Sequence, residues 1–272
     1  SCRQRKCAYF SSPVICKLLF IMTEIQMALN KILMRIAAAA LRRNEELQYF
    51  QPRLIAVSKT KPVEDIISAY ECGQRHFGEN YVQELVDKAS DRKIANHCPD
   101  IKWHFIGHLQ SNKINKIINV PNLYMIETVD SIKLADAINK SWKKVNENIK
   151  LKVYLQVNSS KEESKSGCSL EDAYCLADHV IKNCDVLELC GLMTIGSYDH
   201  SYELSGDNPD YLLLLSCKKD ICNQLGLDPH KMELSMGMSS DFEHAIELGS
   251  NSVRVGSLIF GARNYTEKEL AQ

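Results

Sequence analysis

A single lysine stands where a buried strand is expected to end. The run Leu54–Val57 is apolar throughout and is followed by Ser58, Lys59 and, three residues later, Pro62. An apolar run without polar alternation is typical of a parallel strand that is covered on both faces. Proline is favoured at the first position of a helix, so Pro62 predicts that a helix begins there. Lys59 would then lie at the carboxyl end of a parallel strand, where α/β folds place their chemistry.

The chemistry that such a lysine offers is covalent. A lysine at the rim of a low-dielectric barrel interior loses its proton more readily than one in water, and the neutral amine can attack a carbonyl to form a Schiff base. The alternative is a solvated surface lysine near a strand end, and position alone favours that alternative. The interpretation of Lys59 therefore depends on the rest of the sequence.

Two loops late in the chain are suited to binding phosphate. They read SMGMSSD at residues 235–241 and RVGSLIFG at residues 254–261. Their small residues let backbone N–H groups approach an anion closely, beside hydroxyl groups and expected helix N-termini. Glycine and serine are also ordinary turn residues, so either loop alone is weak evidence. In an eight-stranded barrel, however, the loops after the last two strands form the commonest phosphate site.

Arg254 lies inside an apolar strand pattern, between Val253 and Val255. It could pair with a carboxylate between strand and helix, or it could place a permanent cation beside a bound ligand. An imine-forming lysine, two phosphate-binding loops and an inward arginine together indicate pyridoxal 5′-phosphate. A guanidinium that faces the pyridine nitrogen cannot surrender its proton. It therefore keeps that nitrogen unprotonated and weakens the electron sink that carbanion chemistry requires.

Strand and helix patterns alternate along most of the chain and predict how these residues are positioned. Residues 25–40 have apolar side chains at helical spacing, so an amphipathic helix precedes the Lys59 strand. Further strands are predicted at 75–78, 101–106, 123–126, 151–157, 187–193, 232–236 and 252–255. Short connections between alternating strands and helices imply parallel pairing with right-handed crossovers. The pattern predicts an α/β fold, a single (β/α)8 TIM barrel with an extra N-terminal helix. An open doubly wound sheet is the rival, but no GxGxxG motif follows the first strand.

The first 21 residues are set apart from this pattern. They are basic and then apolar, but Lys17 interrupts the apolar part and no small-residue cleavage site follows. Thr23 and Gln26 have the spacing of a helix capping box. We therefore expect residues 1–21 to be an extension outside the fold and residues 22–272 to form the pyridoxal-phosphate-binding barrel. A mitochondrial presequence is the alternative interpretation of the extension.

Composition excludes several classes of protein. The chain has 272 residues, a formal net charge of −1 and 45% hydrophobic residues. Charges that are balanced and scattered argue against nucleic-acid or membrane partners, and no apolar run is long enough to span a bilayer. The eleven cysteines are odd in number and lack the spacing of a zinc site. We expect no metal, reduced thiols, a cytoplasmic location and a monomer.

Five other side chains lie at positions where a functional or structural role could be expected. His104 and His108 have the spacing of a helical metal pair, but they flank an expected strand end, so we interpret His104 as a core histidine or as one that supports a site residue from behind. Glu127 is expected at a strand end, either as a rim carboxylate or in a salt bridge. Asp130 is expected to cap the next helix, and Tyr81 is given no role.

Several ordered motifs resemble those of the pyridoxal phosphate homeostasis protein family. These motifs are VSKTKP at 57–62, FGENYVQE at 77–84, WHFIGHLQ at 103–110, GLMTIG at 191–196, SMGMSSDFEHAIELGS at 235–250 and VRVGSLIFG at 253–261. The resemblance covers roughly residues 52–263. It implies a single-domain barrel like the N-terminal domain of alanine racemase.

The resemblance also implies a set of cofactor-binding residues. They are Lys59, Asn80, Ser239, Arg254, Gly256 and Ser257. The lysine would carry the cofactor covalently, and the arginine would face the ring nitrogen. The asparagine would lie near the ring hydroxyl, and the two serines and the glycine would hold the phosphate. Ser257 stands where threonine is often found, but the hydroxyl and the backbone donors survive that change.

Members of this family are regarded as carriers or regulators of vitamin B6 supply, without established turnover. The resemblance thus implies a carrier or reservoir of pyridoxal phosphate, with a Schiff base on Lys59 and apo-enzymes that depend on this cofactor as partners. One alternative is a fold-type III amino-acid racemase. Such racemases complete their site with a β-rich second domain, and only a short tail follows Gly261. A Schiff-base aldolase for a phosphorylated sugar is a third reading, but its lysine usually lies on a later strand.

Overall fold

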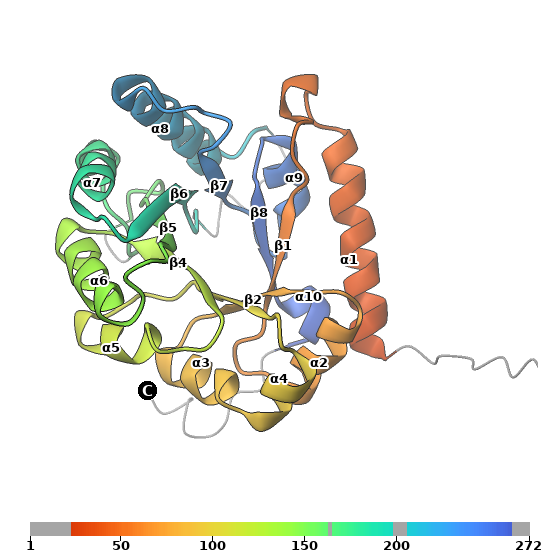
Figure 1. The fold of residues 1–272 in the computed structure, drawn as a ribbon. Helices are drawn as coiled ribbons and strands as arrows, with labels where there is room; N and C mark the ends of the chain where they lie inside the picture. Colours follow the sequence, from red (N-terminus) through yellow and green to blue (C-terminus); the bar gives the residue numbers. More distant parts are fainter. Residues whose placement is uncertain (1–22, 163–164, 198–205, 263–272) are drawn as a thin grey trace, which may run out of the picture.

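Eight parallel strands close into a barrel in the computed structural model, which describes residues 23–162, 165–197 and 206–262 (Figure 1). The strands are β1 (Arg53–Val57), β2 (His76–Glu79), β3 (Lys102–Phe105), β4 (Leu123–Val129), β5 (Leu151–Gln156), β6 (Leu187–Met193), β7 (Glu233–Ser235) and β8 (Ser252–Val255). Each strand pairs in parallel with the next, and β8 pairs with β1. The predicted TIM barrel is confirmed, and the open doubly wound sheet is excluded.

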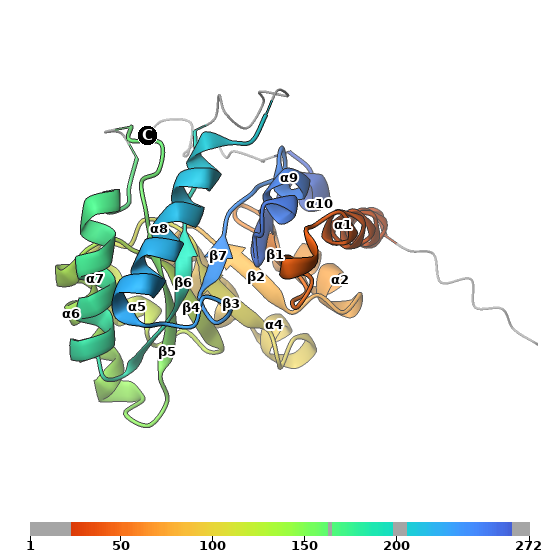
Figure 2. The same cartoon turned by 90° about the horizontal axis from the view of Figure 1, so that it is seen from above.

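Helices surround the barrel (Figure 2). They are α1 (Glu24–Leu41), α2 (Val63–Glu71), α3 (Val82–Ala89), α4 (Arg92–His97), α5 (Ile114–Ile117), α6 (Ile132–Val145), α7 (Leu170–Asn183), α8 (Pro209–Leu225), α9 (Phe242–Glu247) and α10 (Ser257–Phe260). The extra N-terminal helix is α1, which lies against α2, α9 and α10. Its predicted capping box is present, because Thr23 and Gln26 each accept a hydrogen bond from the other's backbone N–H.

Two predicted helix starts are wrong by one residue. Pro62 is the N-cap of α2 rather than its first helical residue, because its backbone is still extended, with φ −69° and ψ 161°. Ser131, not Asp130, caps α6, since the Ser131 hydroxyl accepts a hydrogen bond from the backbone N–H of Leu134. Both shifts leave the helices themselves where the sequence pattern predicts them.

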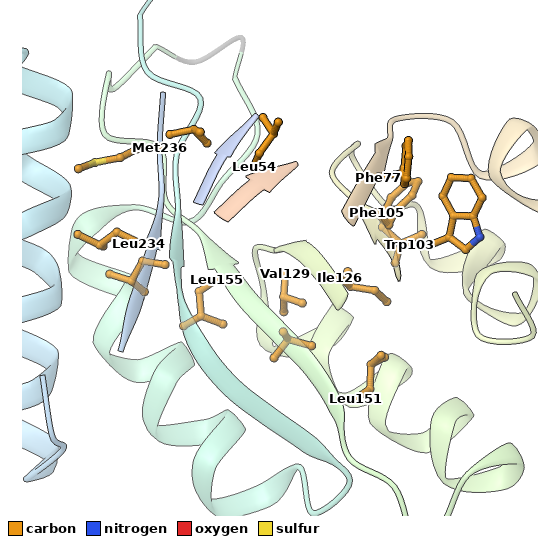
Figure 3. Packing of buried hydrophobic residues seen from close by; sticks show 14 of the residues in the cluster. Leu54, Phe77, Trp103, Phe105, Ile126, Val129, Leu151, Leu155, Leu234 and Met236 are labelled. Atoms are coloured by element: carbon orange, nitrogen blue, oxygen red, sulfur yellow. The ribbon is translucent and has the colours of Figure 1, made fainter. Parts of the chain in front are cut away.

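Alternate residues of the strands build two different environments. Phe77, Trp103 and Phe105 are fully buried and belong to the main apolar core. Figure 3 shows them close together on neighbouring strands, with Trp103 pointing toward a covering helix. Successive side chains of a strand point to opposite faces, so His104, between Trp103 and Phe105, points into the barrel. The interior of the barrel is therefore partly polar, whereas the layer between strands and helices is apolar.

The extension predicted at residues 1–21 lies outside the described residues. Within the described ranges, the cysteines are free thiols. None of the helices in those same ranges combines the length and the apolar character that crossing a bilayer requires.

Candidate functional site

A cavity of about 450 Å³ opens at the carboxyl ends of the strands. Its wall is formed by residues at the ends of β1 and β8 and by residues that follow β1, β2, β3, β6, β7 and β8. The wall includes all the cofactor-binding residues that the sequence suggested, which are Lys59, Asn80, Ser239, Arg254, Gly256 and Ser257. The volume lies within the range of small-molecule sites. The fold thus gathers into one cavity residues that are nearly 200 positions apart in the chain.

Lys59 is half-buried and follows β1 in a turn of unusual geometry. The next residue, Thr60, has a φ of 61°, a left-handed conformation that β-branched residues rarely adopt. The backbone N–H of Thr60 donates to Glu84 Oε1 at 2.6 Å. On the other side, the Ser58 hydroxyl donates to Glu79 Oε1 at 2.6 Å. Both neighbours of Lys59 are therefore tied to side chains from another part of the fold.

The second lysine of the same motif has a different environment. Lys61 also reaches the cavity wall, but its Nζ donates to the backbone carbonyl of Ala262 at 2.5 Å. That contact ties the turn after β1 to the end of the described chain. The amine of Lys61 is therefore engaged in a hydrogen bond that supports the structure at the cavity rim.

The two loops with small residues meet at one side of the cavity. The backbone N–H of Gly256 points to the Ser239 hydroxyl at 3.4 Å, so the loops after β7 and β8 touch. A Cβ at Gly256 would lie 3.0 Å from the carbonyl oxygen of Val57, which is tighter than ordinary packing allows. Glycine therefore allows the loop after β8 to pack closely against the end of β1. Ser257, the first residue of α10, is exposed at this side.

Arg254 is buried, and its guanidinium has neutral hydrogen-bond partners. Its Nη1 donates to the Ser235 hydroxyl at 2.6 Å, and its Nη2 donates to the carbonyl of Thr194 at 2.7 Å. Neither acceptor is a carboxylate, so the predicted alternative of an ion pair between strand and helix is not what the structure shows. The charge of Arg254 lies at the cavity wall.

A hydrogen-bonded chain of buried and half-buried side chains runs through the barrel below Arg254. The Ser235 hydroxyl donates to Glu127 Oε2 at 2.7 Å, and Glu127 Oε1 lies 2.7 Å from His104 Nδ1. The other ring nitrogen of His104 lies 2.8 Å from His76 Nδ1. Sequence alone led to separate interpretations of His104 and Glu127 and did not indicate that they share a hydrogen-bonded chain. The available signal was their position as polar residues within otherwise apolar strands.

Glu127 is not the rim carboxylate that one of its two interpretations suggested. The strand β4 extends to Val129, so Glu127 lies inside the barrel and is fully buried. Its Oε1 contacts His104 Nδ1 at 2.7 Å, which is the geometry of the salt-bridge interpretation when the imidazole is protonated. Burial alone would raise the pKa of Glu127, but the hydrogen bond from His104 and the charges of His104 and Arg254 lower it below its ordinary value. Burial also lowers the pKa of His76 to about 2, helped by His104 and Arg53, so His76 is neutral.

Of the remaining sequence candidates, only His104 belongs to this hydrogen-bonded chain. His104 is a buried core histidine, as predicted, whereas the His108 side chain is 56% exposed and lies 3.8 Å from Asp130. The two histidines therefore do not form a metal pair. Tyr81, which was given no role, is an exposed residue at the start of α3.

Comparison with known proteins gives consistent matches over most of the chain. The family described as "Alanine racemase, N-terminal domain" matches residues 35–264. The human pyridoxal phosphate homeostasis protein is 52% identical over 241 residues, which cover 89% of this chain and 87% of the human protein. The structure of PipY from Synechococcus elongatus with pyridoxal phosphate bound aligns with a TM-score of 0.69 and 28% identity, covering 87% of this chain and all of PipY. An alanine racemase from Clostridium difficile aligns with a TM-score of 0.63 at 15% identity, covering 89% of this chain and 58% of the racemase, a likeness of fold alone.

Proposed function

Because this chain belongs to the alanine racemase N-terminal domain family and, within it, to the pyridoxal phosphate homeostasis proteins, we propose that it binds pyridoxal 5′-phosphate as a carrier or reservoir. The observation that carries the proposal is the meeting of Lys59, Arg254 and the two small-residue loops in one cavity. The cofactor seen in the structure of PipY supports the same ligand.

The residues around the cavity fit this cofactor. An amine, a buried cation and a two-loop cradle match its aldehyde, ring nitrogen and phosphate. In addition, Asn80 Oδ1 is buried and has no hydrogen-bond partner among the described residues, although such oxygens are normally bonded. A ring hydroxyl would supply the missing donor. The sequence assignments of Lys59, Arg254 and Asn80 therefore remain our proposal for the covalent anchor, the ring-nitrogen contact and the hydroxyl contact.

The phosphate would be held by Ser239, Gly256 and Ser257. The first two lie in contact where the loops after β7 and β8 meet, and the third opens α10 beside them. Their hydroxyls and backbone N–H groups are donors suited to a phosphate dianion. We expect these contacts to bind and orient the cofactor before Lys59 bonds to it.

Holding the cofactor without turnover is consistent with the environment of Arg254. When bound, pyridoxal phosphate supplies an aldehyde that reacts with amines and a ring that can accept electrons. A guanidinium acts only as a hydrogen-bond donor, and Arg254 already donates to Ser235 and Thr194. It would therefore face the ring nitrogen of a bound cofactor without giving it a proton. Attachment to a lysine amine is reversible in water, which suits delivery to apo-enzymes that depend on this cofactor. We propose that the chain does this as a monomer.

Intact mass after borohydride reduction tests the covalent anchor. We expect one pyridoxal phosphate per chain, mapped to Lys59, and no adduct in Lys59→Ala. Lys61→Ala is the matched variant from the same turn and should retain the covalent adduct. A full adduct in Lys59→Ala would show that the lysine assignment is wrong.

Turnover is tested separately with single enantiomers of amino acids. We expect no interconversion at ordinary enzymatic rates by the loaded protein. Interconversion at such rates that disappears in Lys59→Ala would replace the carrier proposal with the racemase alternative.

A further inference from the structure

A buried group of charges lies beneath the Lys59 turn. Lys88 of α3 donates from Nζ to the carbonyl of Ser58 at 2.6 Å, to Glu84 Oε1 at 2.7 Å and to Glu79 Oε1 at 2.8 Å. An ammonium has three N–H donors, so all the donors of Lys88 are in use. Its side chain is only 7% exposed, and that of Glu79 is fully buried. We call Lys88, Glu79 and Glu84 the Lys88 cluster.

The Lys88 cluster holds the residues on both sides of Lys59. Ser58 is held twice, because its carbonyl accepts from the cluster's ammonium and its hydroxyl donates to a carboxylate of the cluster. Thr60 is held by its backbone N–H, which donates to Glu84 Oε1, the same oxygen that the ammonium contacts. The backbone direction at Lys59 is therefore set by side chains from β2 and α3.

Thr60 needs such a contact to keep its conformation. Its φ of 61° lies in the left-handed region, which is unfavourable for a β-branched residue. The Thr60 hydroxyl is buried without a hydrogen-bond partner among the described residues, so its side chain offers no compensation. Without the Glu84 acceptor, the turn would relax toward negative φ. That relaxation would rotate the peptide after Lys59 and redirect the lysine side chain.

We infer that Glu84, held by Lys88, is a positioning residue that aims the Lys59 amine at the bound aldehyde. This inference rests on the proposed function. None of the three residues of the Lys88 cluster is part of the cavity wall, so the cluster acts on the cofactor only through the turn. Its effect should therefore appear in the bond to Lys59 and not in the contacts to the phosphate.

Two ligands separate these effects. Pyridoxal 5′-phosphate can bond to Lys59, whereas pyridoxine 5′-phosphate has an alcohol in place of the aldehyde and cannot. We expect Glu84→Ala to weaken the binding of pyridoxal 5′-phosphate by about tenfold to a hundredfold, as expected for a misplaced reacting group. The same variant should change the affinity for pyridoxine 5′-phosphate by less than about twofold, within the error of additivity. Glu84→Gln keeps an oxygen acceptor and should restore most of the binding of the aldehyde.

The two affinities also separate the ways in which this inference can fail. Equal weakening of both ligands by Glu84→Ala would mean that Glu84 only maintains the fold, and the positioning role would be wrong. Wild-type protein that binds neither ligand would contradict the proposed function instead. In that case hydrogen exchange of the ligand-free protein still decides whether Glu84 holds the backbone N–H of Thr60.

Hydrogen exchange at the Thr60 amide tests the hold directly. We expect this amide to be protected in the wild type and in Glu84→Gln and to exchange rapidly in Glu84→Ala. Glu64→Ala is the matched control, because Glu64 pairs with Lys93 on an exposed surface. It should change neither the protection of Thr60 nor the affinity for the aldehyde. Unchanged protection of Thr60 in Glu84→Ala would overturn the inference whatever the binding data show.

Discussion

The two ends of the barrel interior each contain an arginine, and their partners differ. Arg53 begins β1 and donates to both carboxylate oxygens of Glu233, at 2.8 and 3.1 Å. Arg254, on the adjacent strand β8, donates to a hydroxyl and a carbonyl and to no carboxylate among the residues that the structure describes. The charge at the amino-terminal end is thus neutralised within the protein. The charge at the carboxyl-terminal end remains available to a ligand, in line with the division of barrels into a stabilising end and a functional end.

The pKa shifts of the amino-terminal pair are consistent with a structural unit. Burial alone would lower the pKa of Arg53, but the hydrogen bond and charge of Glu233, with Tyr154 and Tyr124, together raise it. Burial alone would raise the pKa of Glu233, but the contacts with Arg53, the hydrogen bond from Tyr154 and the charge of Lys152 together lower it below its ordinary value. The hydroxyl of the fully buried Tyr154 also donates to Glu233. Both charges are therefore held by contacts that exist only in the folded protein.

Removing the carboxylate from the amino-terminal pair should have the largest effect on stability. Glu233→Ala leaves the Arg53 charge and the Tyr154 hydroxyl without their acceptor. The two charged side chains are 24% and 28% exposed, so we expect the lower end of the range for a broken buried pair, about 3 kcal/mol of unfolding free energy. Urea denaturation measures the loss. The affinity for pyridoxal phosphate should stay within about twofold of wild type, since distant sites act nearly independently. Loss of that affinity with unchanged stability would break the distinction between the two ends.

The pH dependence of stability should have opposite signs for the two ends. Burial raises the pKa of Glu79, beneath the Lys59 turn, from 4.5 to about 7, although Lys88 opposes the change. Its stabilising contribution is complete below about pH 4.5 and is lost as the pH rises through about 7, because the unfolded chain releases this proton first. Glu233 has a lowered pKa, so its contribution is present at neutral pH and is lost as the pH falls.

Glu79→Gln isolates the contribution of the carboxyl-terminal end. The unfolding free energy of the wild type should decline between about pH 5 and pH 8. We expect the decline to be smaller by roughly 2 kcal/mol in the variant, since each pKa unit corresponds to about 1.4 kcal/mol. Denaturant midpoints across this pH range measure the difference. A variant whose decline parallels that of the wild type would show that Glu79 does not titrate in this range.

Replacing the carboxyl-terminal arginine should have the smallest effect on stability and a clear effect on binding. Arg254→Met removes hydrogen bonds from a charged donor to neutral acceptors, so we expect a loss of about 1.5 kcal/mol in unfolding free energy, the lower end for such bonds. The affinity for pyridoxal phosphate should fall about tenfold, which corresponds to about 1.4 kcal/mol. Calorimetry and an absorbance titration measure the two quantities. A stability loss as large as that of Glu233→Ala, with normal binding, would show that both arginines are structural.

The carboxyl-terminal end was largely predictable from the sequence. Lys59 and the loops that contain Ser239 and Gly256 are local motifs, and a parallel barrel brings the carboxyl ends of its strands together once the alternation of elements is recognised. The inward direction of Arg254 was one of two stated alternatives. The structure shows its acceptors to be a hydroxyl and a carbonyl.

The amino-terminal pair, the hydrogen-bonded chain inside the barrel and the Lys59 turn depend on contacts that no local sequence pattern specifies. The pairing of Arg53 with Glu233 and the chain through Glu127 join residues more than 100 positions apart, so they follow from the register of the closed barrel. The left-handed Thr60 contradicts its own local preference, since β-branched residues disfavour that conformation. Its conformation is stabilised by Glu84, a contact that sequence reasoning did not foresee.

The pairing of β8 with β1 has a consequence for synthesis of the chain. The amine comes from the first strand and the guanidinium from the last, so both reach the same cavity only when the cylinder is complete. While β8 is still inside the ribosome, the growing chain has two open sheet edges, and the residues of the site are not yet together. Only a chain whose barrel has closed can therefore bind pyridoxal phosphate at this site. The amount of cofactor that a cell can bind in this way would follow its number of fully translated chains.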